Sequence, residues 1–161
     1  MNIRLASVED LERIKEIYVH AKAYMVETGN PNQWLDGYPR REMLEEDIER
    51  GQLYVMEDCG HLYGAFAFII GEDDTYQHIE DGAWRSDATY GTIHRIASSG
   101  EAKGLLHICM EYCLKQIDYI RIDTHHDNKV MQHLILKEGF MPCGIIYAID
   151  GNPRIAYDYI K

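Results

Sequence analysis

Apolar residues recur along the chain at two spacings, which separate predicted helices from predicted strands. Leu11, Ile14 and Tyr18 lie three or four residues apart, the spacing that keeps side chains on one face of a helix. Ser7 and Asp10 precede the first turn at the spacing of a capping box, so the first helix is predicted to run from there to about residue 27. The same periodicity predicts three more helices, over residues 41–50, 105–116 and 128–138.

Shorter apolar segments bounded by turn residues predict strands. Residues 61–70 end in a run that is apolar on both faces, as expected of a strand in the centre of a sheet. A long acidic stretch, residues 71–87, shows neither periodicity, and loops of that length in compact domains usually serve function. Seven strands are predicted, over residues 2–6, 52–57, 61–70, 90–97, 119–124, 141–149 and 154–160.

The order of these elements, β-α-α-β-β-β-α-β-α-β-β, predicts a mixed α/β layer fold. With 161 residues, the chain is expected to form a single domain over residues 1–161, because two halves would each be too small to bury a sizeable core.

Charge narrows the class of partner. The chain has 27 acidic and 16 basic side chains, a net charge of −11, which repels nucleic acid and attracts a cationic small molecule or a peptide amine. The longest apolar run, residues 65–70, is too short to cross a bilayer, and the N-terminus lacks a signal-peptide pattern. We therefore expect a cytoplasmic protein with no nucleic-acid or membrane partner, and the sequence leaves a homodimer open.

Two groups of side chains have the composition of metal ligands. Cys109 and Cys113 lie four residues apart on one face of a predicted helix, where buried free thiols are common, and no second pair completes a tetrahedral set. In His125-His126-Asp127, neighbours at a strand end are expected to face opposite ways, so that one ion cannot readily bind all three. We therefore expect no metal. A metal-dependent hydrolase built on the His125 region is an alternative that metal analysis would settle.

The most informative segment joins a strand, a small-residue loop and an amphipathic helix. After Ser98 the chain continues as Ser99-Gly100-Glu101-Ala102-Lys103-Gly104, and a helix is predicted to follow. A helix start directs several free N–H groups and the positive end of the helix dipole to one spot, which suits a pyrophosphate. The alternative is an ordinary strand-to-helix turn in which Ser98 and Glu101 form a capping box.

This loop and the element order together resemble the GNAT superfamily of acyl-CoA-dependent N-acetyltransferases, over essentially the whole chain. The resemblance implies a central twisted sheet of about seven strands flanked by about four helices, and acetyl-CoA as co-substrate. It also implies that the backbone of Ile96, Ala97 and Ser98 pairs with the pantetheine arm. The family's Q/R-x-x-G-x-G/A loop, which binds the pyrophosphate, corresponds to Glu101-Ala102-Lys103-Gly104-Leu105-Leu106. Glu101 and Leu106 depart from that pattern.

A second family segment, N-x-x-A-x-x-L-Y-x-K-x-G-F, corresponds to residues 128–140. The resemblance places Asn128 at the pantetheine arm. Ile135 occupies the position of the tyrosine that often protonates the departing CoA thiolate, and isoleucine cannot donate a proton. Together with Glu101, this departure favours an alternative from another class: a GNAT-like domain that binds acyl-CoA as a sensor or interaction module without turnover.

The family mechanism is direct transfer, in which a neutral amine attacks the thioester carbonyl and backbone N–H groups stabilise the oxyanion. An ammonium must first lose its proton, so a base is expected. His94, on the strand that leads to the loop, carries an imidazole, which titrates near neutral pH. Glu80 and Asp81, in the acidic stretch, are the other candidates.

Two tryptophans lie in polar segments next to charged residues. Trp34 and Trp84 are each interpreted either as core residues or as walls of a pocket for the amine acceptor, which would also include Glu80. Arg95 is expected to form a buried ion pair with an acid such as Asp123.

Overall fold

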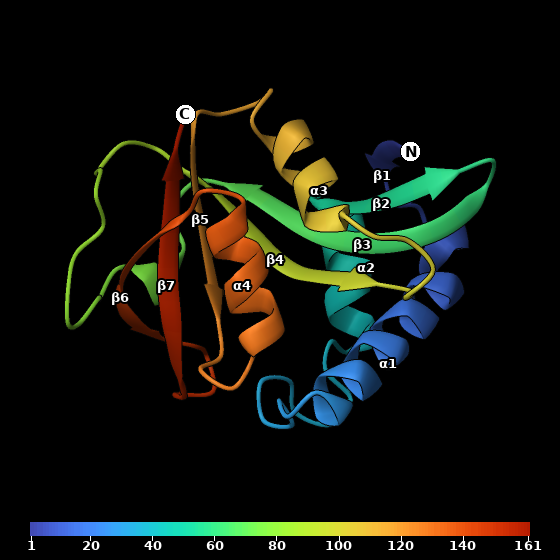
Figure 1. Ribbon diagram of the computed structural model, residues 1–161. Coiled ribbons are helices and arrows are strands. Elements are labelled where there is room, and N and C mark those ends of the chain that lie inside the picture. Colours follow the sequence, from blue (N-terminus) through green and yellow to red (C-terminus); the bar gives the residue numbers. More distant parts are fainter.

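The computed structural model describes all 161 residues, and seven strands join in one mixed sheet (Figure 1). The strands stand in the order β1-β2-β3-β4-β5-β7-β6, and β4 and β5 form the one parallel pair. The strands are β1 (Asn2–Leu5), β2 (Leu53–Asp58), β3 (His61–Ile70), β4 (Gly91–Ser98), β5 (Tyr119–Thr124), β6 (Met141–Tyr147) and β7 (Pro153–Ile160). The α-helices are α1 (Leu11–Glu27), α2 (Arg41–Glu49), α3 (Leu105–Cys113) and α4 (Lys129–Lys137), and the short 3-10 helices are η1 (Val8–Asp10) and η2 (Asp74–Tyr76). The predicted fold class, a mixed sheet of seven strands with four helices, is confirmed.

The helices cover opposite faces of the sheet. In Figure 1, α3 and α4 lie in front of the strands and α2 lies behind them. Each face has its own core, as expected for a layered fold whose strands are buried on both sides. Phe66, Ile120 and Ile135 belong to the core under α3 and α4, whereas Ile14 and Leu44 belong to the core under α1 and α2.

The segment between β3 and β4, residues 71–90, is tied to the far side of the sheet although it has little regular structure. It extends beside β6 and β7 in Figure 1, and Glu80 forms an antiparallel bridge with Ile145. The fully buried carboxylate of Asp158 accepts hydrogen bonds from the backbone N–H of Arg85 and from its Nε. Arg121 lies over the Trp84 ring at 4.1 Å. These contacts hold the segment over the face opposite α3 and α4.

Local predictions differ from the structure by two residues or more at three places. The Ser7–Asp10 capping box forms, with the Ser7 N–H donating to Asp10 Oδ2 at 2.8 Å, but it opens the 3-10 turn η1 and α1 begins only at Leu11. The predicted helix over residues 105–116 ends at Cys113, and the predicted strand over 141–149 ends at Tyr147. No helix in the structure is long and apolar enough to cross a membrane.

Candidate functional site

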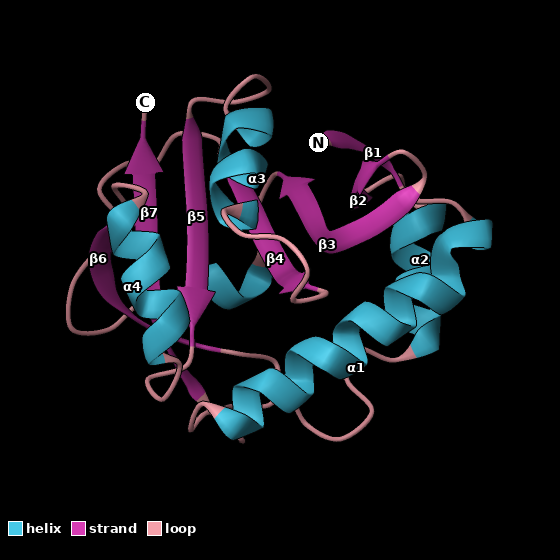
Figure 2. Ribbon diagram, turned by 45° about the vertical axis from the view of Figure 1, so that its right-hand side comes forward, coloured by secondary structure: helices cyan, strands magenta, loops and turns pink.

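The strands β4 and β5 pair only over their first residues and then separate (Figure 2). Gly91 pairs with Ile120 and Thr92 with Arg121, and no β5 residue pairs with β4 beyond that point. A cavity of about 610 Å³ occupies the opening. On the face of α1 and α2 its wall includes His94 and Asp123. On the other face it includes Asn128, the N-cap of α4, and Met131 within α4. The opening therefore joins the two faces of the sheet, which a site for two substrates requires.

A bulge in β4 shapes this opening. Arg95 has φ 52°, in the left-handed region that non-glycine residues seldom adopt, and the β3–β4 register shifts between Ala65 and Ala67. The buried Tyr18 hydroxyl donates to the Arg95 carbonyl oxygen at 2.8 Å, and the guanidinium forms an ion pair with Asp47 of α2. The strained residue is thus held by both N-terminal helices. Arg95 thus forms the expected buried ion pair with an acid, but the partner is Asp47 rather than Asp123, because the bulge turns the guanidinium toward α2.

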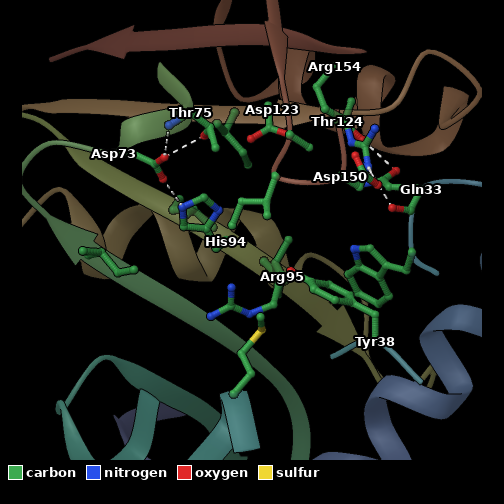
Figure 3. Close-up of a pocket in the computed structure, with 18 of the residues that line it drawn as sticks. Gln33, Tyr38, Asp73, Thr75, His94, Arg95, Asp123, Thr124, Asp150 and Arg154 are labelled. Carbon is green, nitrogen blue, oxygen red and sulfur yellow. Dashed lines mark hydrogen bonds and ion pairs between the residues drawn. The ribbon is translucent and has the colours of Figure 1, made fainter. Parts of the chain in front are cut away.

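His94 lies directly before the bulge, and its imidazole hydrogen-bonds to Asp73 of the β3–β4 segment. Its Nε2 lies 2.7 Å from Asp73 Oδ2, and Asp73 Oδ1 accepts hydrogen bonds from the N–H and hydroxyl of Thr75 (Figure 3). Burial alone would raise the pKa of Asp73, but the hydrogen bonds from His94 and Thr75 outweigh it and lower the pKa to about 2. Asp73 is therefore ionised at neutral pH and orients the imidazole in the cavity wall.

Asp123 faces the cavity from β5 and has a different environment. Its Oδ2 accepts a hydrogen bond from the Tyr76 hydroxyl at 2.6 Å, and burial raises its pKa. Figure 3 shows Asp123 between the Asp73–His94 pair on one side and Arg154 on the other. Two acids of one wall thus have pKa values moved in opposite directions, an arrangement that is typical of acid–base sites.

The predicted phosphate loop has the backbone that the prediction requires. Gly104 is the N-cap of α3 with φ 73°, and a Cβ there would meet no protein atom within 4 Å. The first intrahelical bond recorded at this end runs from the Ile108 N–H to the Gly104 carbonyl oxygen, so the N–H groups of the first turn remain free for a ligand. Lys103 is exposed, Ala102 is half-buried and Leu105 packs into the core.

Glu101 does not form the alternative capping box with Ser98. Its carboxylate pairs with Arg13 Nη2 at 2.8 Å and with His61 Nε2 at 3.1 Å. The Ser98 hydroxyl instead accepts a hydrogen bond from the Gly100 N–H. The negative charge that departs from the family pattern is therefore directed away from the free N–H groups of α3.

The predicted pantetheine residues lie along the unpaired edge of β4. Ala97 and Ser98 pair with β3 on one side, and the edge toward β5 has no strand partner from Ile93 onward, including Ile96. Asn128 lines the cavity, but its side chain has structural partners: Oδ1 accepts from the Met131 N–H and Nδ2 donates to Gln33 Oε1.

Ile135 is fully buried in the core under α3 and α4. The position at which the family often has a tyrosine is therefore closed to the cavity as well as unable to donate a proton.

The structure separates the three residues predicted to form one acceptor pocket. Trp34 lines the cavity, packed edge-on against Tyr18 at a centroid distance of 5.7 Å. Trp84 does not line it: the indole N–H donates to the Tyr76 carbonyl oxygen, and the ring packs under the β3–β4 segment. Glu80, also predicted as a base, is exposed outside the cavity, where His78 and Tyr147 hold its carboxylate. Trp84 and Glu80 are therefore corrected to structural residues of that segment.

The side chains of residues 125–127 do not face opposite ways, contrary to the expectation for a strand end. His125 and His126 stack with ring centroids 4.2 Å apart, and one ligand atom from each residue of the triplet lies within 4.8 Å of the others. The chain turns after β5, so neighbouring side chains converge there. His125 Nδ1 already accepts a hydrogen bond from the Asp127 N–H. Burial, followed by electrostatic interaction with His126 and Arg154, lowers the pKa of His125.

Comparison with solved structures decides the family. The chain is similar to a GNAT-family acetyltransferase from Streptococcus agalactiae with a TM-score of 0.89 and 34% sequence identity, over 99% of this chain and 95% of that one. The chain belongs to the GNAT family of acetyltransferases. A putative acetyltransferase from Staphylococcus aureus has a TM-score of 0.70 and 26% identity over 99% of both chains. No family model matches the sequence, and no curated protein matches it.

The GNAT fold also extends to a chain of the NatC complex bound to Gag peptide and CoA. That chain has a TM-score of 0.61 and 14% identity, over 99% of this chain and 98% of its own, which shows a common fold alone.

Three residues of the cavity region were missed by sequence reasoning: Asp73, Tyr76 and Asp123 as a cavity-lining acid. Asp73 and Tyr76 lie in a stretch without periodicity, so no pattern showed which of its acids turns inward. A signal for Asp123 was present. On β5 Asp123 alternates with Ile120 and Ile122, which face the core under α3 and α4, so its own side chain faces the other side of the sheet. Both faces of this sheet are covered, and a charged residue on either face is therefore a candidate site residue.

Proposed function

We propose that this GNAT domain transfers the acetyl group of acetyl-CoA to a primary amine by direct attack in the cavity between β4 and β5. The observation that supports the proposal is the opening itself: one continuous cavity is lined by His94, hydrogen-bonded to Asp73, on one face of the sheet and by residues of α4 on the other. Acetyl-CoA would approach from the side of α3 and α4, with its pyrophosphate at Gly104, and the amine from the side of α1 and α2.

His94 is the proposed base in this reaction. It accepts a proton from the acceptor ammonium, and the neutral amine nitrogen then attacks the thioester carbonyl carbon. A C–N bond forms, the C–S bond breaks, and the sulfur leaves as the CoA thiolate. The proton that the nitrogen still carries after attack is lost as the amide forms, and the thiolate takes up a proton to leave as CoA thiol. Asp73 stabilises the imidazolium that forms and fixes the ring orientation, because its carboxylate is already 2.7 Å from His94 Nε2. Free N–H groups on the open edge of β4 would stabilise the oxyanion.

A second candidate is a GNAT-like protein that binds acyl-CoA without turnover, and the buried Ile135 favours it. Two measurements separate the candidates. A melt with acetyl-CoA, CoA and longer acyl-CoAs tests binding, where a ligand at a hundred times its Kd stabilises the fold by about 2.7 kcal/mol. A screen for amine-dependent release of CoA thiol then tests turnover. Binding without turnover over a broad amine panel would favour the sensor, and no shift with any acyl-CoA would overturn both. A cytoplasmic location remains part of this proposal.

A further inference from the structure

The charges around the cavity are almost completely paired. Five acids and five basic side chains line it. Four of the acids have a basic partner within 4.0 Å: Glu46 with Arg50, Asp47 with Arg95, Asp73 with His94, and Asp150 with Arg154. Asp123 has none, and Tyr76 is its one hydrogen-bond donor. The cavity wall therefore contains one carboxylate without a cation.

Asp123 is suited to receive a positive charge. It lies on the same face of the sheet as His94, and the Tyr76 hydroxyl binds Oδ2, which leaves Oδ1 free. Burial disfavours the ionised carboxylate, and His94 and Arg154 favour it only from beyond 4.0 Å, so an arriving ammonium would supply the direct counter-charge that is missing. A charge-assisted hydrogen bond formed in such surroundings is stronger than one formed in water.

One part of the cavity wall, formed by Trp34, Leu35, Tyr38 and Met43, is apolar. Trp34 and Tyr38 pack with ring centroids 6.0 Å apart, and the side chains of Leu35 and Ile149 line the cavity although the two residues are 56% and 94% exposed. Apolar side chains that line a cavity suit an apolar ligand. Arg40 also lines the cavity, is exposed and has no ion pair, so it repels a second positive charge on the acceptor.

We propose that Asp123 binds the ammonium group of an acceptor that carries one positive charge and an apolar body. The proposal rests on the function above and narrows its substrate class from amines in general to apolar monoamines. Polyamines are disfavoured, because their second ammonium would meet Arg40 and the apolar wall.

Calorimetric binding tests the proposal without turnover. The probes are 2-phenylethylamine, its uncharged analogue 2-phenylethanol, and spermidine, each titrated into the protein alone and into the protein saturated with CoA, which has no acetyl group to transfer. Wild-type protein is expected to bind 2-phenylethylamine at least tenfold more tightly than the other two. Equal affinity for the amine and the alcohol, or tighter binding of spermidine, would overturn the proposal.

Variants then identify the residue. Asp123→Asn keeps an oxygen for the Tyr76 hydroxyl and is expected to weaken 2-phenylethylamine binding at least tenfold, with 2-phenylethanol unchanged. Asp74→Asn is the matched control, because Asp74 is an exposed neighbouring acid outside the cavity, and it should bind like wild type. Where Asp123→Asn does not fold, the wild-type preference for 2-phenylethylamine over 2-phenylethanol is the deciding measurement. Tyr76→Phe keeps the Asp123 carboxylate and should show the same preference.

CoA binding and amine affinity distinguish a failure of the proposed acetyl transfer from a failure of the proposed role of Asp123. If CoA binds but Asp123→Asn leaves amine affinity unchanged, the inference on Asp123 is wrong and the acetyltransferase proposal stands. If neither CoA nor acetyl-CoA binds, the proposed function fails, whereas the amine titrations still report on Asp123.

Discussion

Asp73 links the stability of the fold to the geometry of the site, and its replacement gives a prediction with a defined pH window. The hydrogen bonds from His94 and Thr75 lower the pKa of Asp73 from 3.8 to about 2. At 1.36 kcal/mol for each tenfold change in the ionisation constant, the ionised carboxylate contributes about 2 kcal/mol to the free energy of unfolding. The side chain is only 20% exposed, so solvent screening removes little of this contribution.

The sign follows from the lowered pKa. The contribution is fully present above the unfolded value of 3.8 and is lost as the pH falls through about 2. Urea unfolding of wild type and Asp73→Asn at a series of pH values is the assay. The difference between their free energies of unfolding should be largest near neutral pH and should shrink by about 2 kcal/mol as the pH falls below about 2.

Other carboxylates titrate alike in both proteins and cancel in that difference. Asp74→Asn is again the control, since Asp74 is exposed and its side chain has no ion pair or hydrogen bond. If the difference between wild type and Asp73→Asn stayed constant over this pH range, the pKa of Asp73 would be the same in the folded and unfolded states, and the predicted stabilisation would be absent.

Three further substitutions test separate parts of the site. His94→Gln should lower kcat roughly a hundredfold or more while leaving acetyl-CoA binding intact, as steady-state kinetics and a thermal melt would show; an unchanged kcat would mean that the imidazole is only structural. Gly104→Ala and Gly151→Ala both place a Cβ at positive φ in open space, so each should lower the free energy of unfolding by about 1 kcal/mol. Only Gly104→Ala should raise the Kd of acetyl-CoA, and equal effects on Kd would contradict the pyrophosphate placement. Asp158→Ala removes a fully buried partner of Arg85 and should cost about 3 kcal/mol or more in urea unfolding, whereas a loss below about 1 kcal/mol would show that the β3–β4 segment is anchored elsewhere.

The sequence predicted the layers of the fold because its periodicities are local. The apolar spacing of Leu11, Ile14 and Tyr18 is satisfied by one helix face, and the all-apolar end of β3 by a strand buried on both sides. The loop before α3 was likewise predictable, because a glycine before an apolar helix has a local conformational reason to be there. Gly104 indeed has φ 73°.

The side-chain partners in the site were not predictable, since they depend on long-range geometry. Arg95 pairs with Asp47 rather than Asp123 because one bulged residue in β4 rotates its side chain toward α2. Trp84 and Glu80 share an irregular segment with Asp73, and only the path of that segment over the sheet decides which side chain faces the cavity.

The most direct test of the proposed acetyl transfer is one assay: purified protein with acetyl-CoA and 2-phenylethylamine, in which released CoA thiol and N-acetylated amine are quantified together. Amine-dependent thiol release is expected, with one acetylated amine for each thiol, and its rate should fall roughly a hundredfold or more in His94→Gln. Thiol release that is independent of the amine, or acetyl-CoA binding with no acetylated product from this or any other primary amine, would contradict the proposed acetyl transfer.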